Sequence, residues 1–190
     1  FEFRWRAKRQ GRRNMWDAAF AGGSTVAALT QGIALGALVQ GIPVEGRAYA
    51  GGWWTWLTPF SILTGISLVV GYALLGSTWL VMKTSGALQQ HARERAWPAA
   101  IATLALIGIV SLWTPFLEGA YWQRWFAWPA VLYTFPVPLL VAACAYILLK
   151  GLADGRDATP FFAAMGLFVL SYIGLGISFY PYIVPPSVSI

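Results

Sequence analysis

The sequence predicts an all-α fold, a polytopic bundle of transmembrane helices. Of the 190 residues, 58% are hydrophobic and only 11% are charged, whereas a soluble domain has about 25% charged residues. The mean hydropathy is +0.60, and the charges occur in clusters between long uncharged stretches. These features exclude a soluble enzyme, a disordered chain and a nucleic-acid-binding module, whose basic residues would follow one face or groove.

Five uncharged stretches are long enough to cross a membrane, since about 20 apolar residues span a hydrocarbon layer of roughly 30 Å. None of them alternates apolar and polar residues as the strands of a membrane barrel do. We therefore expect a single membrane domain over residues 1–190. Its spans are predicted at residues 18–40, 56–82, 96–117, 128–149 and 160–184.

Glycines distinguish three of these spans from the other two. The first span contains Gly32 and Gly36 in a G-x-x-x-G pattern, and the second and fifth spans contain three glycines each. Helices associate within lipid by close backbone approach at such residues, so we expect these three spans to be buried among other helices. The third and fourth spans are richer in Leu, Ile and Val, and we expect them to face lipid.

The basic residues predict the orientation, because loops rich in Lys and Arg stay on the cytoplasmic side. The segments before, between and after the spans contain six, one, three, one, two and no basic residues in chain order, which accounts for all 13. This alternation predicts that the Phe1 end is cytoplasmic and that the Ile190 end lies outside.

The segments predicted to lie outside are rich in aromatic residues. These are Trp53, Trp54 and Trp56 at the second span, Tyr121, Trp122, Trp125 and Trp128 before the fourth, and Tyr180 and Tyr182 at the end of the fifth. Amphipathic rings favour the headgroup level of a bilayer, so the first interpretation is a lipid anchor. The alternative is that these rings cover a partner subunit or a buried cofactor.

Few residues can carry chemistry, and all seven acidic residues lie at or outside the ends of the spans. Asp17 stands where an acid complements a helix N-terminus, with proton entry as the alternative role. Gln31 follows fourteen residues later, about 21 Å deeper along a helix. We expect an interhelical hydrogen bond at Gln31, with a contact to a quinone carbonyl as the alternative.

The sequence contains one histidine, His91, which we expect in a cytoplasmic loop, and one cysteine, Cys144. These counts do not allow paired imidazole ligands for a haem or a C-x-x-C motif within these residues. The sequence has no P-loop and no dinucleotide-binding glycine motif in a strand-to-helix context. We therefore predict no catalytic, cofactor-binding or metal-ligating residue in this chain.

Four separated motifs occur in a recognisable order. They are Phe1-Glu2-Phe3-Arg4, then Trp16-Asp17 with Gly23-Ser24, Gln31-Gly32 and Gly36, then GYALLGSTWLVMKTSGALQ at 71–89, and finally YPYIVPPS at 180–187. Together they closely resemble subunit II of the cytochrome bd quinol oxidases, including the cyanide-insensitive branch. The resemblance covers essentially the whole chain. In one departure, Ser85 stands where the family often has an acid.

The resemblance implies a subunit of about eight spans in two four-helix bundles, of which this chain would supply the third to seventh as an internal piece. It implies a heterodimer in which subunit I carries haem b and haem d. Subunit II then supports assembly, and in some members it holds a structural quinone. The complex would oxidise quinol, reduce dioxygen to water and build a proton gradient across the bacterial inner membrane, with small accessory subunits in some cases.

Two other functions compete with this one. A secondary transporter often has broken helices, and such breaks could occur at Pro59, Pro115, Pro136, Pro138 and Pro181. Charge at mid-membrane depth, however, is absent from the spans. A membrane assembly protein would differ from an oxidase subunit in leaving the mature enzyme.

Overall fold

The computed structural model describes residues 10–46, 48–180, 182–184 and 188–189. The predictions on Phe1–Arg4, on Arg6, Lys8, Arg9 and Arg47, on the side chains of Arg12 and Arg13, and on Pro181 and residues 185–187 lie outside what it describes. In chain order, the elements are α2 (Gln10–Val39), β1 (Val44–Glu45), β2 (Ala48–Tyr49), α3 (Pro59–Lys83), α4 (Ala87–Trp113), η1 (Thr114–Phe116), α5 (Gly119–Phe126), α6 (Val131–Thr134), α7 (Pro136–Ala153), α8 (Thr159–Phe179), β3 (Tyr182–Val184) and β4 (Val188–Ser189).

The all-α fold is confirmed, with two short antiparallel hairpins as the strands of the described residues. Five helical segments are long and apolar enough to cross a membrane, as the sequence predicts. They are Asn14–Val39, Pro59–Lys83, Ala87–Phe116, Val131–Ala153 and Thr159–Phe179.

Several helix boundaries differ from the predicted spans. Helix α2 already runs from Gln10, and α4 begins at Ala87, nine residues before the expected start at 96. Both extensions are polar, and hydropathy locates only the part of a helix that crosses the membrane. The extensions are helical nevertheless, because Ala, Leu, Gln, Arg and Glu favour helix in water as well. Helix α8 ends at Phe179, because the residue before a proline, here Tyr180, is disfavoured in helical conformation.

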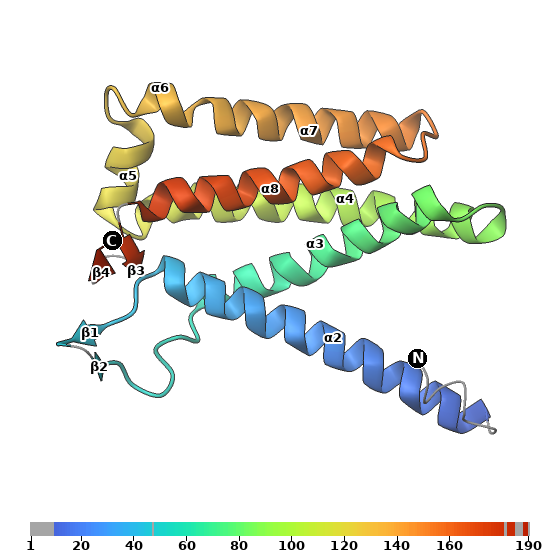
Figure 1. Cartoon of the computed structure of the whole chain (residues 1–190), viewed down its shortest axis with the longest axis horizontal. Helices are drawn as coiled ribbons and strands as arrows, with labels where there is room; N and C mark the ends of the chain where they lie inside the picture. The colour runs from blue at the N-terminus through green and yellow to red at the C-terminus, as the bar shows by residue number, and fades with distance from the viewer. Residues whose placement is uncertain (1–9, 47, 181, 185–187, 190) are drawn as a thin grey trace.

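Helix α3 is the centre of the arrangement, because α2, α4 and α8 all pack against it, while α7 packs on α8 and α4. The long helices run between two ends of the molecule in alternating directions (Figure 1). Helix α2 crosses α3 near its own C-terminal half and then diverges from the bundle (Figure 1). Residues 14–27 of α2 are therefore exposed on every side.

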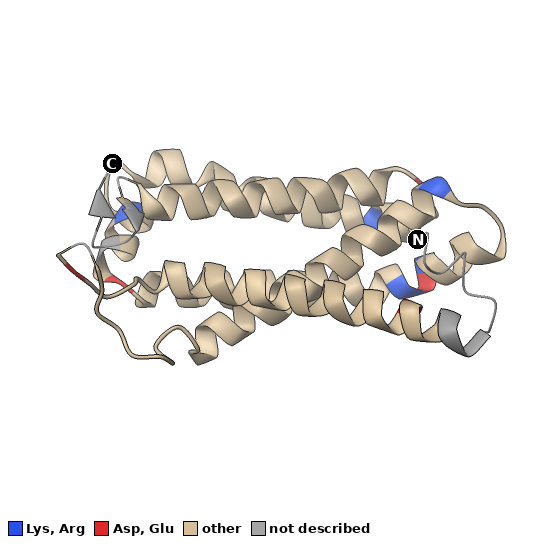
Figure 2. Ribbon diagram, turned by 60° about the horizontal axis from the view of Figure 1, so that its bottom comes forward, with Lys and Arg blue, Asp and Glu red and all other residues tan. Residues whose placement is uncertain are grey.

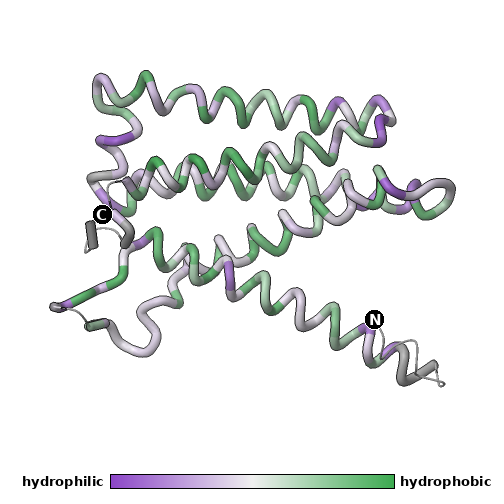
Figure 3. The backbone as a smooth tube through the Cα atoms, viewed as in Figure 1, coloured by the Kyte–Doolittle hydropathy of each residue, from purple (hydrophilic) through white to green (hydrophobic). Residues whose placement is uncertain are grey.

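The connecting segments gather at two ends (Figure 1). One end holds the start of α2, the α3–α4 turn and the α7–α8 turn, and the other holds the β1–β2 hairpin, α5 and the β3–β4 hairpin. The charged residues lie at these ends (Figure 2), and the helices between them are mainly apolar (Figure 3). Consecutive connecting segments thus lie alternately at the two ends (Figure 1).

Two apolar clusters form the core. The larger one joins α3, α4, α7 and α8 through Leu74, Ala96, Ala100, Leu148, Leu152, Ala163, Ala164 and Leu167. The smaller one, at the α5 end, contains Val39, Phe60 and Tyr121. The buried share of the spans is 28%, 33%, 11%, 11% and 28% in chain order, so the first, second and fifth are the more buried, as their glycines predict.

Candidate functional site

Helices α2 and α3 meet at the glycines that the sequence singles out. A Cβ atom on Gly32 would lie 2.7 Å from both the Gly65 Cα and the Thr64 carbonyl oxygen, and one on Gly36 would lie 2.6 Å from the Ser61 Cα. The Thr64 hydroxyl donates a hydrogen bond of 2.9 Å to the carbonyl oxygen of Gly32. Small residues at this crossing therefore serve backbone approach between two helices.

Gln31 lies beside this crossing and contacts the second helix. The Tyr72 hydroxyl of α3 donates to the Gln31 Oε1 at 3.3 Å, and the Tyr72 ring stacks on Phe168 of α8 with the centroids 5.7 Å apart. This is an interhelical hydrogen bond of the kind expected at Gln31. Both Gln31 and Tyr72 are exposed on the surface of the described chain, so a second molecule has access to this polar pair.

Asp17 does not cap a helix, which corrects the sequence interpretation. Helix α2 extends to Gln10, seven residues further toward the N-terminus, and the effect of the helix dipole falls off within the first turn. Asp17 is exposed, and its fourteen-residue separation from Gln31 on one continuous helix corresponds to about 21 Å. The structure does not bring the two candidate residues together.

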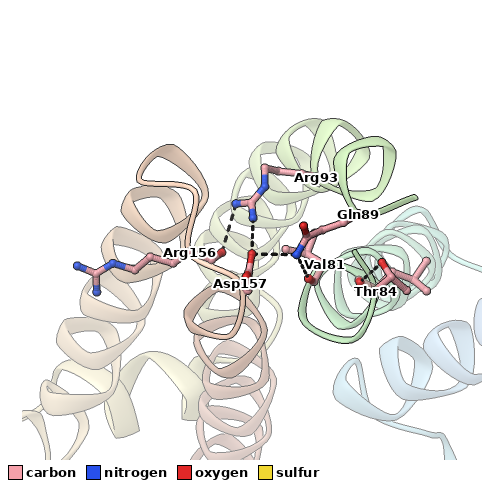
Figure 4. Close-up of polar contacts among 7 residues, drawn as sticks. Val81, Thr84, Gln89, Arg93, Arg156 and Asp157 are labelled. Atoms are coloured by element: carbon pink, nitrogen blue, oxygen red, sulfur yellow. Dashed lines mark hydrogen bonds and ion pairs between the residues drawn. The ribbon is translucent and has the colours of Figure 1, made fainter. Parts of the chain in front are cut away.

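A polar cluster of Gln89, Arg93 and Asp157 joins the α3–α4 turn to the α7–α8 turn (Figure 4). Arg93 Nη2 lies 2.8 Å from Asp157 Oδ1 in an ion pair, and Arg93 Nη1 donates to the Arg156 carbonyl oxygen at 3.2 Å. Gln89 Nε2 donates to the Val81 carbonyl oxygen at 2.9 Å and to Asp157 Oδ1 at 3.0 Å. The cluster links two helical hairpins at one end of the bundle.

Sequence reasoning missed this cluster, because 64 residues separate Arg93 from Asp157 and no local pattern pairs them. The one available signal was that both residues belong to segments predicted on the same side of the membrane. The placement of His91 in a loop is also wrong. His91 lies in the second turn of α4, where its Nδ1 is 3.8 Å from Glu94 Oε2 and its side chain is 65% exposed.

At the opposite end, α5 lies across the ends of α2 and α8 (Figure 1). The Tyr121 side chain is fully buried, and its hydroxyl donates at 2.7 Å to the carbonyl oxygen of Val39, the last residue of α2. One turn later, Trp125 Nε1 donates to the Ser178 hydroxyl of α8 at 2.9 Å, and the Arg124 guanidinium donates to the Ser178 carbonyl oxygen. The short helix thus fastens two long helices that are distant in sequence.

The environment of Tyr121 keeps its hydroxyl protonated. Burial, together with the negative charge of Glu118, raises the pKa of Tyr121 to about 12, and the positive charge of Arg124 opposes the rise. The phenol therefore remains a hydrogen-bond donor toward Val39 throughout the physiological pH range.

These polar groups join helices to one another. In the part of the chain that the structure describes, no three His, Cys, Asp or Glu side chains lie close enough to share a metal ion. Ser77 and Thr78 donate their hydroxyl hydrogen bonds to carbonyl oxygens of the preceding turn, at Leu74 and Leu75, as membrane-helix hydroxyls commonly do.

Comparison with known proteins shows which sequences this chain resembles. The family model described as cytochrome bd terminal oxidase subunit II matches residues 1–190. The chain is 33% identical over 126 residues to cytochrome bd-I ubiquinol oxidase subunit 2 of Escherichia coli K12, a match that covers 64% of this chain and 33% of the relative. It is 27% identical over 216 residues to a probable cytochrome oxidase subunit 2 of Haemophilus influenzae, which covers 98% of this chain and 57% of the relative.

The matches span between 33% and 57% of the length of these curated relatives. Within this chain, however, the family model leaves no residue uncovered, and the helical bundle agrees with the membrane fold that the resemblance implies. The chain belongs to the cytochrome bd terminal oxidase subunit II family.

Proposed function

We propose that this chain works in the second subunit of a cytochrome bd-type quinol oxidase, as the supporting partner of a haem-bearing subunit I. The observation that carries the proposal is the family match over residues 1–190. The complex would oxidise quinol and reduce dioxygen to water, in line with the oxidase names of the relatives.

The one imidazole of this chain does not fit a haem within the membrane layer. The single histidine, His91, is exposed near the start of α4, at one end of the bundle, beside Glu94. An imidazole that ligates a haem must lie at the depth of the porphyrin iron. We therefore assign haem b and haem d to the partner subunit.

The contribution of this chain is structural. Ion pairs and hydrogen bonds fasten the helices at both ends, and large apolar side chains remain exposed along the helices, among them Phe20, Ile101, Leu112, Phe162 and Val169. Lipid or other membrane helices cover such a surface in a membrane. We propose that part of it contacts subunit I, and small accessory subunits where these are present.

The orientation and the wider architecture belong to the same proposal. The end that holds the α3–α4 and α7–α8 turns faces the cytoplasm of a bacterium, and the α5 end faces outward across the inner membrane. The five spans form part of an eight-span subunit with two four-helix bundles. Gln31, whose amide nitrogen is left available by the bond of its oxygen to Tyr72, is the residue we assign to a structural quinone carbonyl.

Co-purification tests the proposal. The full-length subunit with an affinity tag should retain a larger partner and show haem absorbance bands, which should distort or disappear after the subunit is dissociated from that partner. Haem bands that stay with this subunit alone would contradict the division of roles. Substrate uptake by the subunit alone in liposomes, without any haem partner, would favour the transporter instead.

A further inference from the structure

Arg124 is a half-buried cation that forms no ion pair with a carboxylate of the described residues. Among the described residues, Arg93 and Arg156 lie 2.8 Å and 3.6 Å from carboxylate oxygens, whereas no described carboxylate lies within 4.0 Å of the Arg124 guanidinium. Lys83, Arg95 and Lys150 also lack such a pair, but their side chains are exposed to the surroundings.

Within the described part of the chain, Arg124 uses one of its donors in a hydrogen bond and leaves the others without an acceptor. The guanidinium donates to the Ser178 carbonyl oxygen and lies over the rings of Tyr121 and Tyr182, 5.9 Å and 5.4 Å from their centroids. A guanidinium carries five N–H donors in a planar fork that matches carboxylate and phosphate oxygens. One neutral acceptor and two ring faces hold this fork in place without neutralising its charge.

A cavity of about 540 Å³ lies beside this guanidinium. It is lined by Arg124, Ala130, Tyr133, Thr134, Ile177 and Tyr180. The Thr134 hydroxyl in this lining already donates to the Trp125 carbonyl oxygen at 3.0 Å. Arg124 is the charged residue of the lining, so it can bind an anionic ligand. The rest of the lining is mainly apolar and aromatic, and the cavity is open to the surroundings on its outer side.

The depth of the cavity matches the headgroup region of a bilayer. Its walls come from the ends of two membrane spans, Val131–Ala153 and Thr159–Phe179. The rings of Tyr133 and Tyr180 are 80% and 70% exposed, and tyrosine is enriched at the membrane–water interface. A ligand at this level needs an anionic group for Arg124 and apolar groups for the wall.

We propose that this cavity binds the phosphodiester group of a membrane glycerophospholipid, with Arg124 donating to the phosphate oxygens. The glycerol and the first acyl methylenes then lie along Ala130 and Ile177. Charge complementarity selects this occupant over a neutral ring compound, because a neutral ligand would leave the half-buried guanidinium without an anion. The site holds a lipid by charge and shape, and it does not depend on the proposed oxidase function.

Native mass spectrometry of the full-length subunit, with all the subunits that co-purify with it, tests the site during titration with phosphatidylglycerol. Two variants remove it differently: Arg124→Gln removes the charge, and Ala130→Phe fills the cavity while leaving the Arg124 contact to Ser178. The matched control is Arg95→Gln, which neutralises an exposed arginine at the other end. Each site variant should weaken one lipid-binding step by about 10-fold or more, the usual effect of losing a charge-assisted hydrogen bond, and the control should not.

Equal retention of phosphatidylglycerol by the wild type and by Ala130→Phe would overturn the proposal. This comparison remains decisive even if the Arg124→Gln variant does not assemble. Inorganic phosphate provides a second arm. Displacement of the lipid by millimolar phosphate would show a free-anion site instead and would also overturn the lipid assignment. Haem absorbance of the same wild-type sample reports on the oxidase function separately, so the failure of one proposal is distinguishable from the failure of the other.

Discussion

Replacing Gly32 by alanine should separate α2 from α3. The new Cβ would lie 2.7 Å from the Gly65 Cα and from the Thr64 carbonyl oxygen, and both atoms belong to the backbone, so no rotamer change relieves the clash. Ordinary contact begins at 3.4 Å, so the helices must move apart by about 0.7 Å. This movement would lengthen the Thr64–Gly32 hydrogen bond from 2.9 Å to about 3.6 Å, beyond bonding distance.

The cost has three parts. Overpacking costs about 1–3 kcal/mol, the lost interhelical hydrogen bond costs about 0.6 kcal/mol, and the higher helix propensity of alanine returns up to about 1 kcal/mol. The matched control is Gly23→Ala on the same helix, where a Cβ meets nothing within 4 Å. The control gains only the propensity term, so the two variants should differ by about 1.6–3.6 kcal/mol in the free energy of unfolding.

Unfolding of the full-length subunit by sodium dodecyl sulfate in mixed micelles, followed by circular dichroism, measures this difference. Tryptophan fluorescence of the same samples reports on tertiary structure. If Gly32→Ala proves as stable as Gly23→Ala, the α2–α3 crossing does not depend on backbone contact at Gly32, and the packing argument fails.

Three further predictions concern the ends of the bundle. Asp157→Asn should lower the free energy of unfolding by about 0.5–1 kcal/mol, because the Arg93 pair is partly exposed and screened, and high salt should reduce the difference in the same titration. Tyr121→Phe should cost about 1–2 kcal/mol by leaving the Val39 carbonyl oxygen without its donor. Because the pKa of Tyr121 is raised to about 12, the stabilisation that it contributes is full below about pH 10 and is lost between about pH 10 and 12. In a pH series of melting temperatures, the wild type should show this loss and Tyr121→Phe should not. Finally, Trp53→Ala should change the free energy of unfolding by less than about 0.5 kcal/mol, because this side chain is 92% exposed; a larger loss would place Trp53 in a packed contact.

Much of the architecture could be predicted from the sequence because a membrane restricts the choices. Spans follow from the length of uncharged stretches, and the greater burial of the first, second and fifth spans follows from their glycines. The alternation of basic residues likewise assigns each connecting segment to an end. These signals are local in the sequence or depend only on composition.

The contacts that the sequence did not predict are distant in the chain. Tyr121 meets Val39 across 82 residues, and Arg93 meets Asp157 across 64. No local sequence pattern marks either pair. Each contact depends on how two helices are placed relative to one another. The start of α4 was missed for a different reason, because a polar segment of good helix formers continues a membrane helix beyond its apolar part.

The contacts of α8 have a consequence for the biosynthesis of the protein. Helices α2, α3 and α4 each find their main neighbour in the helix made just before or after them, but α8 reaches back to α3 across all the intervening elements. Until α8 leaves the ribosome and enters the bilayer, the side of α3 that carries Gly71 lacks the Phe168 ring that later lies against it. A nascent chain that stalls after α7 would therefore leave the Gly71 side of α3 uncovered by its later neighbour.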